Sequence, residues 1–412
     1  MREQIEGSRA VARAVAAARP HVICAYPISP QTHIVEELSR LVKAEELVSE
    51  YVNVESEFAA MSVAIGASAT GARAYTATSS QGLLYMVEPI YNAAGMRLPI
   101  VMTVANRAIG APINIWNDHS DAMSQRDSGW LQLYAEDNQE AADLHVQAFR
   151  IAEELSVPVM VCMDGFVLTH AFEEVDVPEQ ARVDTFLPPF RPRQRLDPDE
   201  PVTMGAMVGP ETFTEVRYLA HQVQLDAVEV IERVADEFAA AFGRETGGLV
   251  RPYRTTGAET VVVALGSVLG TLKDAVDDAD AAGERIGVLG ITSFRPFPYE
   301  AVREALAGAR RVVVIDRALA PGVGGVVAQD VATALAGTGT DVRCVVAGLG
   351  GRPITQGALL GMLDDALAGR LERLSFLDLD EAVVEREIAR DRAERHEREE
   401  RRGRADAVGA AR

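Results

Sequence analysis

The stretch Asn53-Val54-Glu55-Ser56-Glu57-Phe58 decides the fold, because a predicted β-strand (residues 47–54) passes there into an alanine-rich helix. Ser56 is a candidate N-cap, since its hydroxyl can accept a hydrogen bond from a backbone N–H of the first helical turn. Open parallel sheets bind their ligands beyond the carboxyl ends of the strands. A carboxylate is also stable at a helix N-terminus without any ligand. Glu55 and Glu57 are therefore either part of a site or plain helix-terminal charges.

Strands and helices alternate on both sides of this stretch. Apolar runs predict further strands at 21–26, 73–78, 99–104 and 158–163. Amphipathic and alanine-rich patterns predict helices at 8–18, 31–43, 57–70, 83–94 and 138–155. Ser8 is expected to cap the first of these helices, and Pro89 to kink the fourth. Such alternation with continuously apolar strands is typical of a parallel sheet that helices cover on both faces.

A second α/β unit is predicted farther along the chain. Its strands are expected at 260–265, 285–289, 311–315 and 342–346. We expect a first domain over 1–245, with a proline-rich linker at about 174–201 and a largely helical stretch at 211–242, and a second domain over 255–375. Residues 378–412 form a tail of Glu and Arg, which is either a solvated helix or a frayed end.

Composition excludes several classes of function. The 61 acidic residues outnumber the 40 basic ones, for a formal charge of −21, which argues against nucleic acid or an anionic membrane as a partner. No apolar run approaches the ~20 residues of a membrane span, and no secretory signal is present. We therefore expect a cytoplasmic protein. Its three cysteines lie far apart, so neither a disulfide framework nor a metal or iron–sulfur ligand set is expected in this chain.

Two motifs have a simpler explanation than the chemistry they suggest. The glycine clusters that follow strands do not form the G-x-G-x-x-G fingerprint or a phosphate loop, so tight turns account for them and a self-contained dehydrogenase is a poor hypothesis. Asp118-His119-Ser120-Asp121 contains metal-ligand residue types, but a loop rich in Asp and Ser also caps helices. We therefore expect neither a phosphate site at the glycine clusters nor a metal site at Asp118–Asp121.

Ser29 and Arg107 follow predicted strands at the same sheet edge as Glu57. A guanidinium can hold a carboxylate with two parallel hydrogen bonds, although Arg107 alone would be explained by a surface salt bridge. Ser29 lies between Pro27 and Pro30, where it can donate its hydroxyl to a ligand or simply make a turn. The three residues together favour a site over the simpler explanations.

Several motifs of this chain resemble the α subunit of pyruvate:ferredoxin oxidoreductase. In the first half these are Tyr26-Pro27-Ile28-Ser29-Pro30, Glu55-Ser56-Glu57, Thr78-Ser79-Ser80-Gln81-Gly82, the run from Asn106 to Asp121, Asp127-Ser128-Gly129-Trp130 and Met163-Asp164-Gly165-Phe166. In the second half they are Ser293-Phe294-Arg295-Pro296-Phe297-Pro298 and Gly348-Leu349-Gly350-Gly351-Arg352. The run from Arg107 to Asp121 is the most specific. The resemblance covers residues 7 to about 371 and leaves out the charged tail.

The resemblance implies a fold and a cofactor. The first domain would be a pyrimidine-type thiamine diphosphate-binding domain with a parallel sheet, and the second would be similar to a transketolase C-terminal domain. Glu57 would be the carboxylate against the aminopyrimidine ring, and Glu55 a nearby decoy. Arg107 and Ser29 would hold the substrate carboxylate, with Ser29 standing where some relatives have Thr. Pro27 and Gln81 would complete the cofactor-binding positions.

An absent motif completes this hypothesis. Thiamine enzymes hold the diphosphate through Mg²⁺ with a Gly-Asp-Gly motif, which this sequence lacks. The resemblance therefore implies a β-type partner that supplies the diphosphate half of the site and the metal. Iron–sulfur clusters would lie on partner chains, which include γ- and δ-type or fused subunits.

The predicted function is that of the α subunit of a 2-oxoacid:ferredoxin oxidoreductase. It would convert pyruvate and coenzyme A to acetyl-CoA and CO₂ and pass the electrons to ferredoxin. Two alternatives stay open from the sequence: a sister complex that acts on a branched-chain or aromatic 2-oxoacid, and a non-catalytic scaffold subunit of such a complex. The physiological direction, the subunit stoichiometry and the roles of His119 and of the charged tail are not determined by the sequence.

Overall fold

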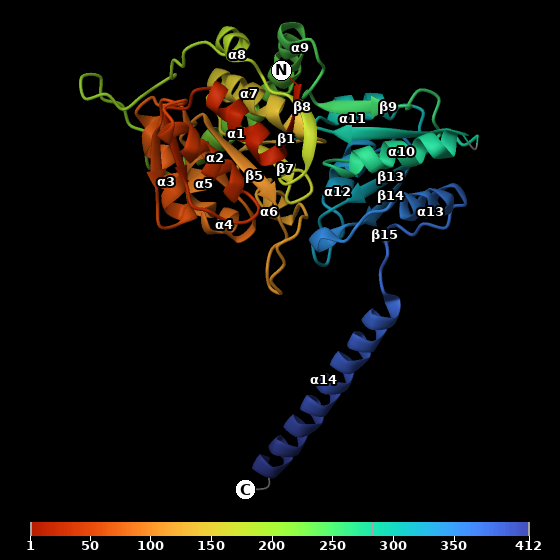
Figure 1. Cartoon of the computed structure of the whole chain (residues 1–412). Coiled ribbons are helices and arrows are strands. Elements are labelled where there is room, and N and C mark those ends of the chain that lie inside the picture. Colours follow the sequence, from red (N-terminus) through yellow and green to blue (C-terminus); the bar gives the residue numbers. More distant parts are fainter. Residues whose placement is uncertain (1, 282, 411–412) are drawn as a thin grey trace. The chain divides into compact units, whose positions relative to one another are not determined.

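A computed structural model of the chain describes residues 2–281 and 283–410 (Figure 1). It divides into two compact units, 1–375 and 376–412, which are described separately. The strands are β1 (Arg2–Glu6), β2 (Val22–Ala25), β3 (Glu50–Asn53), β4 (Ala74–Thr78), β5 (Ile100–Asn106), β6 (Leu131–Tyr134), β7 (Val159–Asp164), β8 (Phe172–Asp176), β9 (Val250–Tyr253), β10 (Thr260–Ala264), β11 (Ile286–Ile291), β12 (Ser293–Arg295), β13 (Arg311–Asp316), β14 (Asp341–Val346) and β15 (Leu374–Phe376). The helices are α1 (Gly7–Ala17), α2 (Thr32–Lys43), α3 (Glu57–Ala69), α4 (Ser80–Tyr85), α5 (Val87–Gly95), α6 (Ser120–Met123), α7 (Asn138–Leu155), α8 (Gln180–Phe186), α9 (Phe213–Phe242), α10 (Val268–Ala281), α11 (Tyr299–Ala305), α12 (Val327–Ala334), α13 (Gln356–Leu367) and α14 (Glu381–Ala410), with a 3₁₀ turn η1 (Leu349–Gly351).

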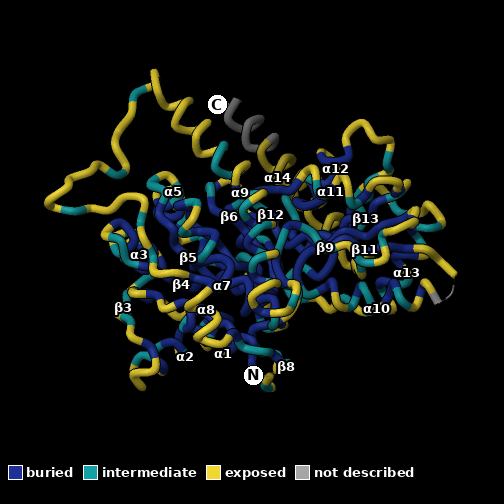
Figure 2. The backbone as a smooth tube through the Cα atoms, turned by 90° about the horizontal axis from the view of Figure 1, so that it is seen from above, coloured by how far each residue is buried: buried dark blue, intermediate teal, exposed yellow. Residues whose placement is uncertain are grey.

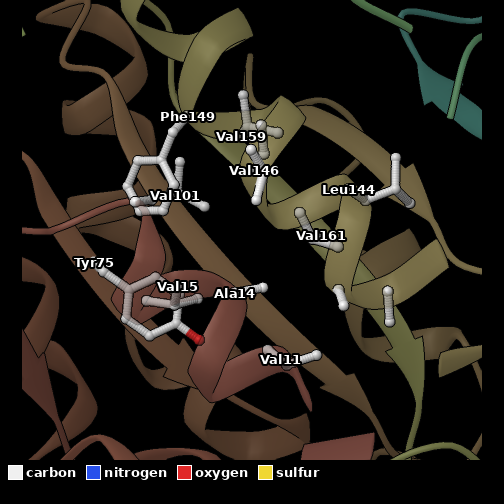
Figure 3. Packing of buried hydrophobic residues seen from close by; sticks show 14 of the residues in the cluster. Val11, Ala14, Val15, Tyr75, Val101, Leu144, Val146, Phe149, Val159 and Val161 are labelled. Atoms are coloured by element: carbon white, nitrogen blue, oxygen red, sulfur yellow. The ribbon is translucent and has the colours of Figure 1, made fainter. Parts of the chain in front are cut away.

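The first sheet has seven strands in the order β12-β6-β7-β5-β4-β2-β3. All neighbours in it pair in parallel except β12, which pairs antiparallel with β6. Because the side chains of a strand alternate between faces, Val101 packs into the cluster formed with α1, α2 and α7, and Met102 into the cluster formed with α3, α4 and α5. Figure 3 shows Val101 and Val159 of the strands in the same buried cluster as Val15 of α1 and Phe149 of α7.

The second sheet has the order β15-β14-β13-β10-β11-β9. Strands β14, β13, β10 and β11 are parallel, and β9 runs antiparallel to β11. The strands expected at 260–265, 285–289, 311–315 and 342–346 are confirmed within a few residues. Figure 2 shows the inner strands β5, β11 and β13 in the buried colour.

The two sheets share a hydrophobic core. Strand β12 belongs by sequence to the second α/β unit, yet it extends the first sheet beyond β6, with Ser293 opposite Leu133. One buried cluster includes Met102 and Met160 of the first sheet together with Leu289 and Val312 of the second. The α/β architecture with two largely parallel sheets is the predicted fold class, and it is confirmed.

The segment expected as a linker at about 174–201 has regular structure in its first part. Strand β8 pairs antiparallel with β1 in a two-stranded ribbon, and α8 follows. Neither element has a full apolar face, because exposed charged residues alternate with buried ones such as Val175, and the sequence therefore lacked a clear period. Between α8 and α9, residues 187–212 contain no helix or strand.

Two predicted helices differ in detail. The helix expected at 83–94 is two helices, α4 and α5, which meet at Met86. Pro89 does not kink it, because Pro89 lies in the first turn of α5, where a missing N–H costs no helical hydrogen bond. The helix expected from Ser8 begins at Gly7, and Ser8 is not its cap. The Ser8 hydroxyl donates instead to the carbonyl of Thr169 at 2.7 Å.

The second unit, 376–412, contains α14. Along α14 the described side chains are exposed except that of Glu387, which is half-buried. Ion pairs link successive turns, such as Arg395–Asp391 at 2.7 Å and Arg398–Glu394 at 3.3 Å. Of the two alternatives for the tail, the structure is the solvated helix. None of the helices in the described ranges has the length and apolarity to cross a lipid bilayer.

Candidate active site

Glu57 is the first residue of α3, directly after β3. The predicted cap is confirmed, since the Ser56 side chain accepts a hydrogen bond from the backbone N–H of Ala59 at 3.2 Å. Glu57 is 7% exposed, whereas Glu55 is exposed to solvent. The turn at Ser56 therefore directs one carboxylate into the protein and leaves the other outside.

The carboxylate of Glu57 has no hydrogen bond or ion pair with any residue in the described ranges. It lies against Gly82, where a Cβ would be 2.5 Å from Glu57 Oε1 and 2.6 Å from Thr78 Oγ1. The Thr78 hydroxyl is itself buried and has no partner in the structure. Buried polar groups in proteins are nearly always hydrogen-bonded. The Glu57 carboxylate and the Thr78 hydroxyl both lie beside Gly82 and have no partner among the described residues, so they could contact a polar ligand.

Arg107 follows β5 and has a buried side chain. Its Nη1 donates to the carbonyl of Ser29 at 2.9 Å, and its Nε donates to the carbonyl of Asn114 at 3.2 Å. Burial lowers the pKa of this guanidinium, against the opposing effect of Asp121. Arg107 therefore joins the loop after β2 to the loop after β5, and Nη2 makes no hydrogen bond among the described residues.

The other predicted site residues lie at the same sheet edge. Ser29 and Pro27 are exposed in the loop between β2 and α2, and Ser29 meets Arg107 through its carbonyl. Gln81 is half-buried in α4, accepts a hydrogen bond from the Ser80 hydroxyl at 2.5 Å, and faces Gly110, where a Cβ would be 2.7 Å from its Nε2. The carboxyl ends of parallel strands meet at one edge of a sheet. The segments that follow β2, β3, β4 and β5 therefore bring the five predicted residues to this edge: Pro27, Ser29, Glu57, Gln81 and Arg107.

Asp121 has a structural role that the sequence did not predict, although its motif drew attention as a possible metal ligand. It is fully buried, and its Oδ2 accepts hydrogen bonds from the backbone N–H groups of Ser80 at 2.9 Å and Arg107 at 3.0 Å. Its Oδ1 accepts from Asn106 Nδ2 at 2.9 Å. Burial raises the pKa of Asp121 to about 6, although these hydrogen bonds favour the ionised form. This carboxylate fixes the relative positions of the loops after β4 and β5.

Asp164 links the loop after β5, which carries His119, to the second α/β unit. It lies at the end of β7, fully buried, and contacts His119 Nε2 at 2.6 Å and Arg317 Nη1 at 2.7 Å. It also accepts from the backbone N–H of Ser267 at 2.9 Å. Burial by itself would raise the pKa of Asp164, but Arg317 and His119 more than offset it and hold that pKa well below its usual range. The sequence left the role of His119 open, and in the structure its imidazole pairs with the buried carboxylate of Asp164.

The run from Arg107 to Asp121 is pressed against the loop at η1. Asn114 Nδ2 donates to the carbonyl of Gly350 at 3.0 Å, and the N–H of Gly350 donates to Asp118 Oδ2 at 3.2 Å. Gly351 lies very close to Trp116: a Cβ added at Gly351 would be 2.3 Å from the Cβ of Trp116. Asp118 Oδ1 also accepts from Ser120 N at 2.9 Å, but the N-cap position of α6 is His119, which makes no side-chain cap.

A cavity of about 310 Å³ lies elsewhere in the unit 1–375, at the amino ends of β5 and β6. Its lining includes Arg97, Arg126 and Trp130, and none of the predicted site residues lines it. This cavity is therefore separate from the sheet edge that carries Glu57.

Known proteins share both halves of this chain. Residues 13–236 match the family model described as pyruvate flavodoxin/ferredoxin oxidoreductase, thiamine diphosphate-binding, and residues 258–358 match pyruvate:ferredoxin oxidoreductase core domain II. Pyruvate synthase subunit PorA of Methanosarcina barkeri is 50% identical over 92% of this chain and 97% of its own length. Ketoisovalerate oxidoreductase subunit VorA of Pyrococcus abyssi is 39% identical over 90% and 96%, respectively.

A solved structure shares the fold. The chain of 2-oxoglutarate:ferredoxin oxidoreductase from Magnetococcus marinus superimposes with a TM-score of 0.65 at 18% identity, over 89% of this chain. This chain spans 65% of that solved chain.

Proposed function

Since this chain belongs to the pyruvate:ferredoxin oxidoreductase family, as an α subunit of the 2-oxoacid:ferredoxin oxidoreductase type, we propose that its complex acts on pyruvate. Pyruvate and coenzyme A would give acetyl-CoA and CO₂, with the electrons passing to ferredoxin. The higher identity to the relative named for pyruvate, 50% against 39% for the relative named for ketoisovalerate, supports pyruvate over a branched-chain 2-oxoacid.

The observation that carries the proposal is the carboxylate of Glu57, on a side chain that is only 7% exposed and makes no hydrogen bond or ion pair among the described residues. An aminopyrimidine ring offers a nitrogen that can share a proton with this carboxylate, which would satisfy Glu57 and remove the cost of burying a charge alone. The Thr78 hydroxyl offers a second polar contact on the same side of Gly82. The residues present thus fit the pyrimidine half of thiamine diphosphate, with Pro27 and Gln81 as further contacts from the neighbouring loops.

When bound, thiamine diphosphate supplies a carbon nucleophile and an electron sink for decarboxylation of the 2-oxoacid. Glu57 would accept a hydrogen bond from the ring nitrogen and so hold a proton at that atom. Glycine at position 82 leaves Glu57 undisturbed, since a Cβ there would lie 2.5 Å from Glu57 Oε1.

Arg107 and Ser29 would hold the substrate carboxylate. Arg107 is anchored through Nε and Nη1, so its remaining N–H groups keep a fixed direction. An oriented guanidinium binds a carboxylate more tightly than a mobile one, because less side-chain entropy is lost on binding. The Ser29 hydroxyl lies in the loop whose carbonyl Arg107 already contacts, and it would donate the adjoining hydrogen bond.

The chain would act only with partners. Its sequence has no Gly-Asp-Gly motif, so a β-type subunit would hold the diphosphate and Mg²⁺. Its three cysteines are buried and separate, so the iron–sulfur clusters would lie on γ- and δ-type or fused subunits.

Glu57→Gln in the assembled complex tests this proposal, with Glu55→Gln as the matched control. Pyruvate-dependent reduction of a viologen dye should fall by about 10²–10⁴-fold in Glu57→Gln, while size-exclusion chromatography finds the complex intact. Glu55→Gln should keep wild-type rates, since Glu55 faces solvent. Full activity in Glu57→Gln would remove Glu57 from the mechanism and favour the scaffold alternative. A faster reaction with 2-oxoisovalerate than with pyruvate in the wild-type complex would favour the sister enzyme.

A further inference from the structure

Three side chains whose residue types can bind metal ions lie close together, and Glu57 is not one of them. Glu6 lies at the end of β1, His33 in the first turn of α2, and His170 in the loop between β7 and β8. Their ligand-type atoms all lie within 4.8 Å of one another. In the described ranges, no other three His, Cys, Asp or Glu side chains converge in this way.

Glu6 is the buried member of this cluster, at 6% exposure. Its Oε1 lies 2.6 Å from His33 Nδ1, and its Oε2 lies 3.6 Å from Arg9 Nε. The Arg9 side chain is 57% exposed, so solvent screens its charge. Arg9 is thus on the Oε2 side, and Oε1 is the oxygen that faces the His33 imidazole.

His170 is oriented by its neighbours. Its Nδ1 lies 2.7 Å from Thr169 Oγ1, an oxygen that also accepts from the N–H of Phe166 at 2.8 Å. The ring centroid of Phe166 is 4.8 Å from that of His170, and the ring of His33 lies 4.6 Å away. When Nδ1–H donates to Thr169, Nε2 presents its lone pair. Metal-binding histidines usually have this second hydrogen bond, which fixes the tautomer and the ring.

We propose that Glu6, His33 and His170 form a three-ligand site for a divalent transition cation of the zinc class. Two imidazoles and one carboxylate favour such ions over Mg²⁺, which prefers oxygen ligands. Zn–N and Zn–O distances are about 2.0–2.2 Å, so the outermost ligand atoms must approach each other by roughly 1 Å. The 2.6 Å hydrogen bond between Glu6 Oε1 and His33 Nδ1 must open, and its proton is released to solvent when the ion binds. His33 is half-exposed and can make this adjustment, and solvent can fill the open coordination position.

The ion would connect elements that border the Ser29 loop. His33 follows that loop by only a few residues, and Pro30 packs on Gly165, where a Cβ would be 2.6 Å from Pro30 Cγ. A metal bridge between α2, β1 and the loop after β7 would therefore brace the loop from behind. This site is independent of the proposed reaction, because it needs neither thiamine diphosphate nor a partner chain.

Zn²⁺ titration of the full-length chain, first stripped with a chelator, tests the site. Calorimetry should give one equivalent per chain, and Zn²⁺ should raise the melting temperature, whereas Mg²⁺ should do neither. Glu6→Gln, His33→Gln and His170→Gln should each weaken binding by about 100-fold or more, since even changes to outer partners cost 10–100-fold. His396→Gln in α14 is the matched control and should bind as the wild type does.

Circular dichroism and the metal-free melting temperature identify any variant that fails to fold. His33→Gln should fold in any case, since the His33 side chain is 45% exposed. Zn²⁺ uptake that is equal in the wild type and in the His33→Gln/His170→Gln double variant would overturn the proposal. Loss of binding in His396→Gln would overturn it as well, because the ion would then lie on the tail.

Discussion

Gly82→Ala probes the space beside Glu57 without touching the carboxylate itself. Gly82 is the third residue of α4 and has an ordinary helical backbone that alanine can adopt. Its new Cβ would be 2.5 Å from Glu57 Oε1, about 0.9 Å short of the 3.4 Å at which ordinary contact begins. Thr78 Oγ1, at 2.6 Å, blocks a simple retreat of the methyl group. Glu57 must therefore move by about 1 Å.

The expected loss is in catalysis more than in stability. A displacement of about 1 Å in a catalytic group costs roughly 10²-fold in rate. Overpacking in a core costs about 1–3 kcal/mol, but alanine has about 1 kcal/mol more helix propensity than glycine. The free energy of unfolding should thus fall by about 2 kcal/mol at most, while kcat/KM for the 2-oxoacid falls about 100-fold.

Dye reduction by the assembled complex and urea denaturation of the chain measure the two quantities. Gly66→Ala is the matched control, because Gly66 lies in α3 and a Cβ there meets nothing within 4 Å. It should leave kcat/KM unchanged and raise the free energy of unfolding by up to about 1 kcal/mol. Equal kcat/KM in Gly82→Ala and Gly66→Ala would refute the reasoning that catalysis depends on the position of Glu57 beside Gly82.

Three further substitutions follow from the same contacts. Arg107→Lys keeps the charge but loses the planar fork, so KM for the 2-oxoacid should rise at least 10-fold with a smaller change in kcat; an unchanged KM would assign the substrate carboxylate to another group. Asp164→Asn leaves the buried Arg317 without its carboxylate partner. Denaturation should find the free energy of unfolding lower by about 3–5 kcal/mol, and a loss below about 1 kcal/mol would contradict the importance of this ion pair. Burial raises the pKa of Glu140 to about 7 from an ordinary 4.5, so the folded state binds the extra proton and stability is lost as the pH rises through that window. Glu140→Gln should therefore flatten the decline in unfolding free energy between about pH 5 and pH 8, by roughly 3 kcal/mol at most; an unchanged slope would contradict the raised pKa.

Local patterns in the sequence were sufficient for the architecture. The apolar runs at β5, β7, β10 and β13 have one conformation that buries them on both faces, and Ser56 marks where α3 begins. The separation of Glu57 from Glu55 needed the resemblance, because both acids are plausible at a helix N-terminus. Their burial in the structure now distinguishes them on physical grounds.

Long-range contacts account for what the sequence did not predict. Asp121 and Asp164 have partners that are 41 and 153 residues away, respectively, and neither pairing leaves a periodic pattern. The ribbon of β1 and β8 joins two segments that have little apolar content, so each is unremarkable until the other is in place. The end of α4 at Met86 likewise depends on packing and not on Pro89.

The central claim is that Glu57 activates a coenzyme whose other end a partner chain holds. Deuterium exchange at the thiazolium C2 position of thiamine diphosphate, followed by NMR after acid quench, tests this claim without the substrate or the iron–sulfur clusters. In the assembled complex, Glu57→Gln should slow the exchange by about 10²–10⁴-fold relative to the wild type and to Glu55→Gln. Equal exchange rates in Glu57→Gln and the wild type, with the coenzyme bound in both, would contradict the claim.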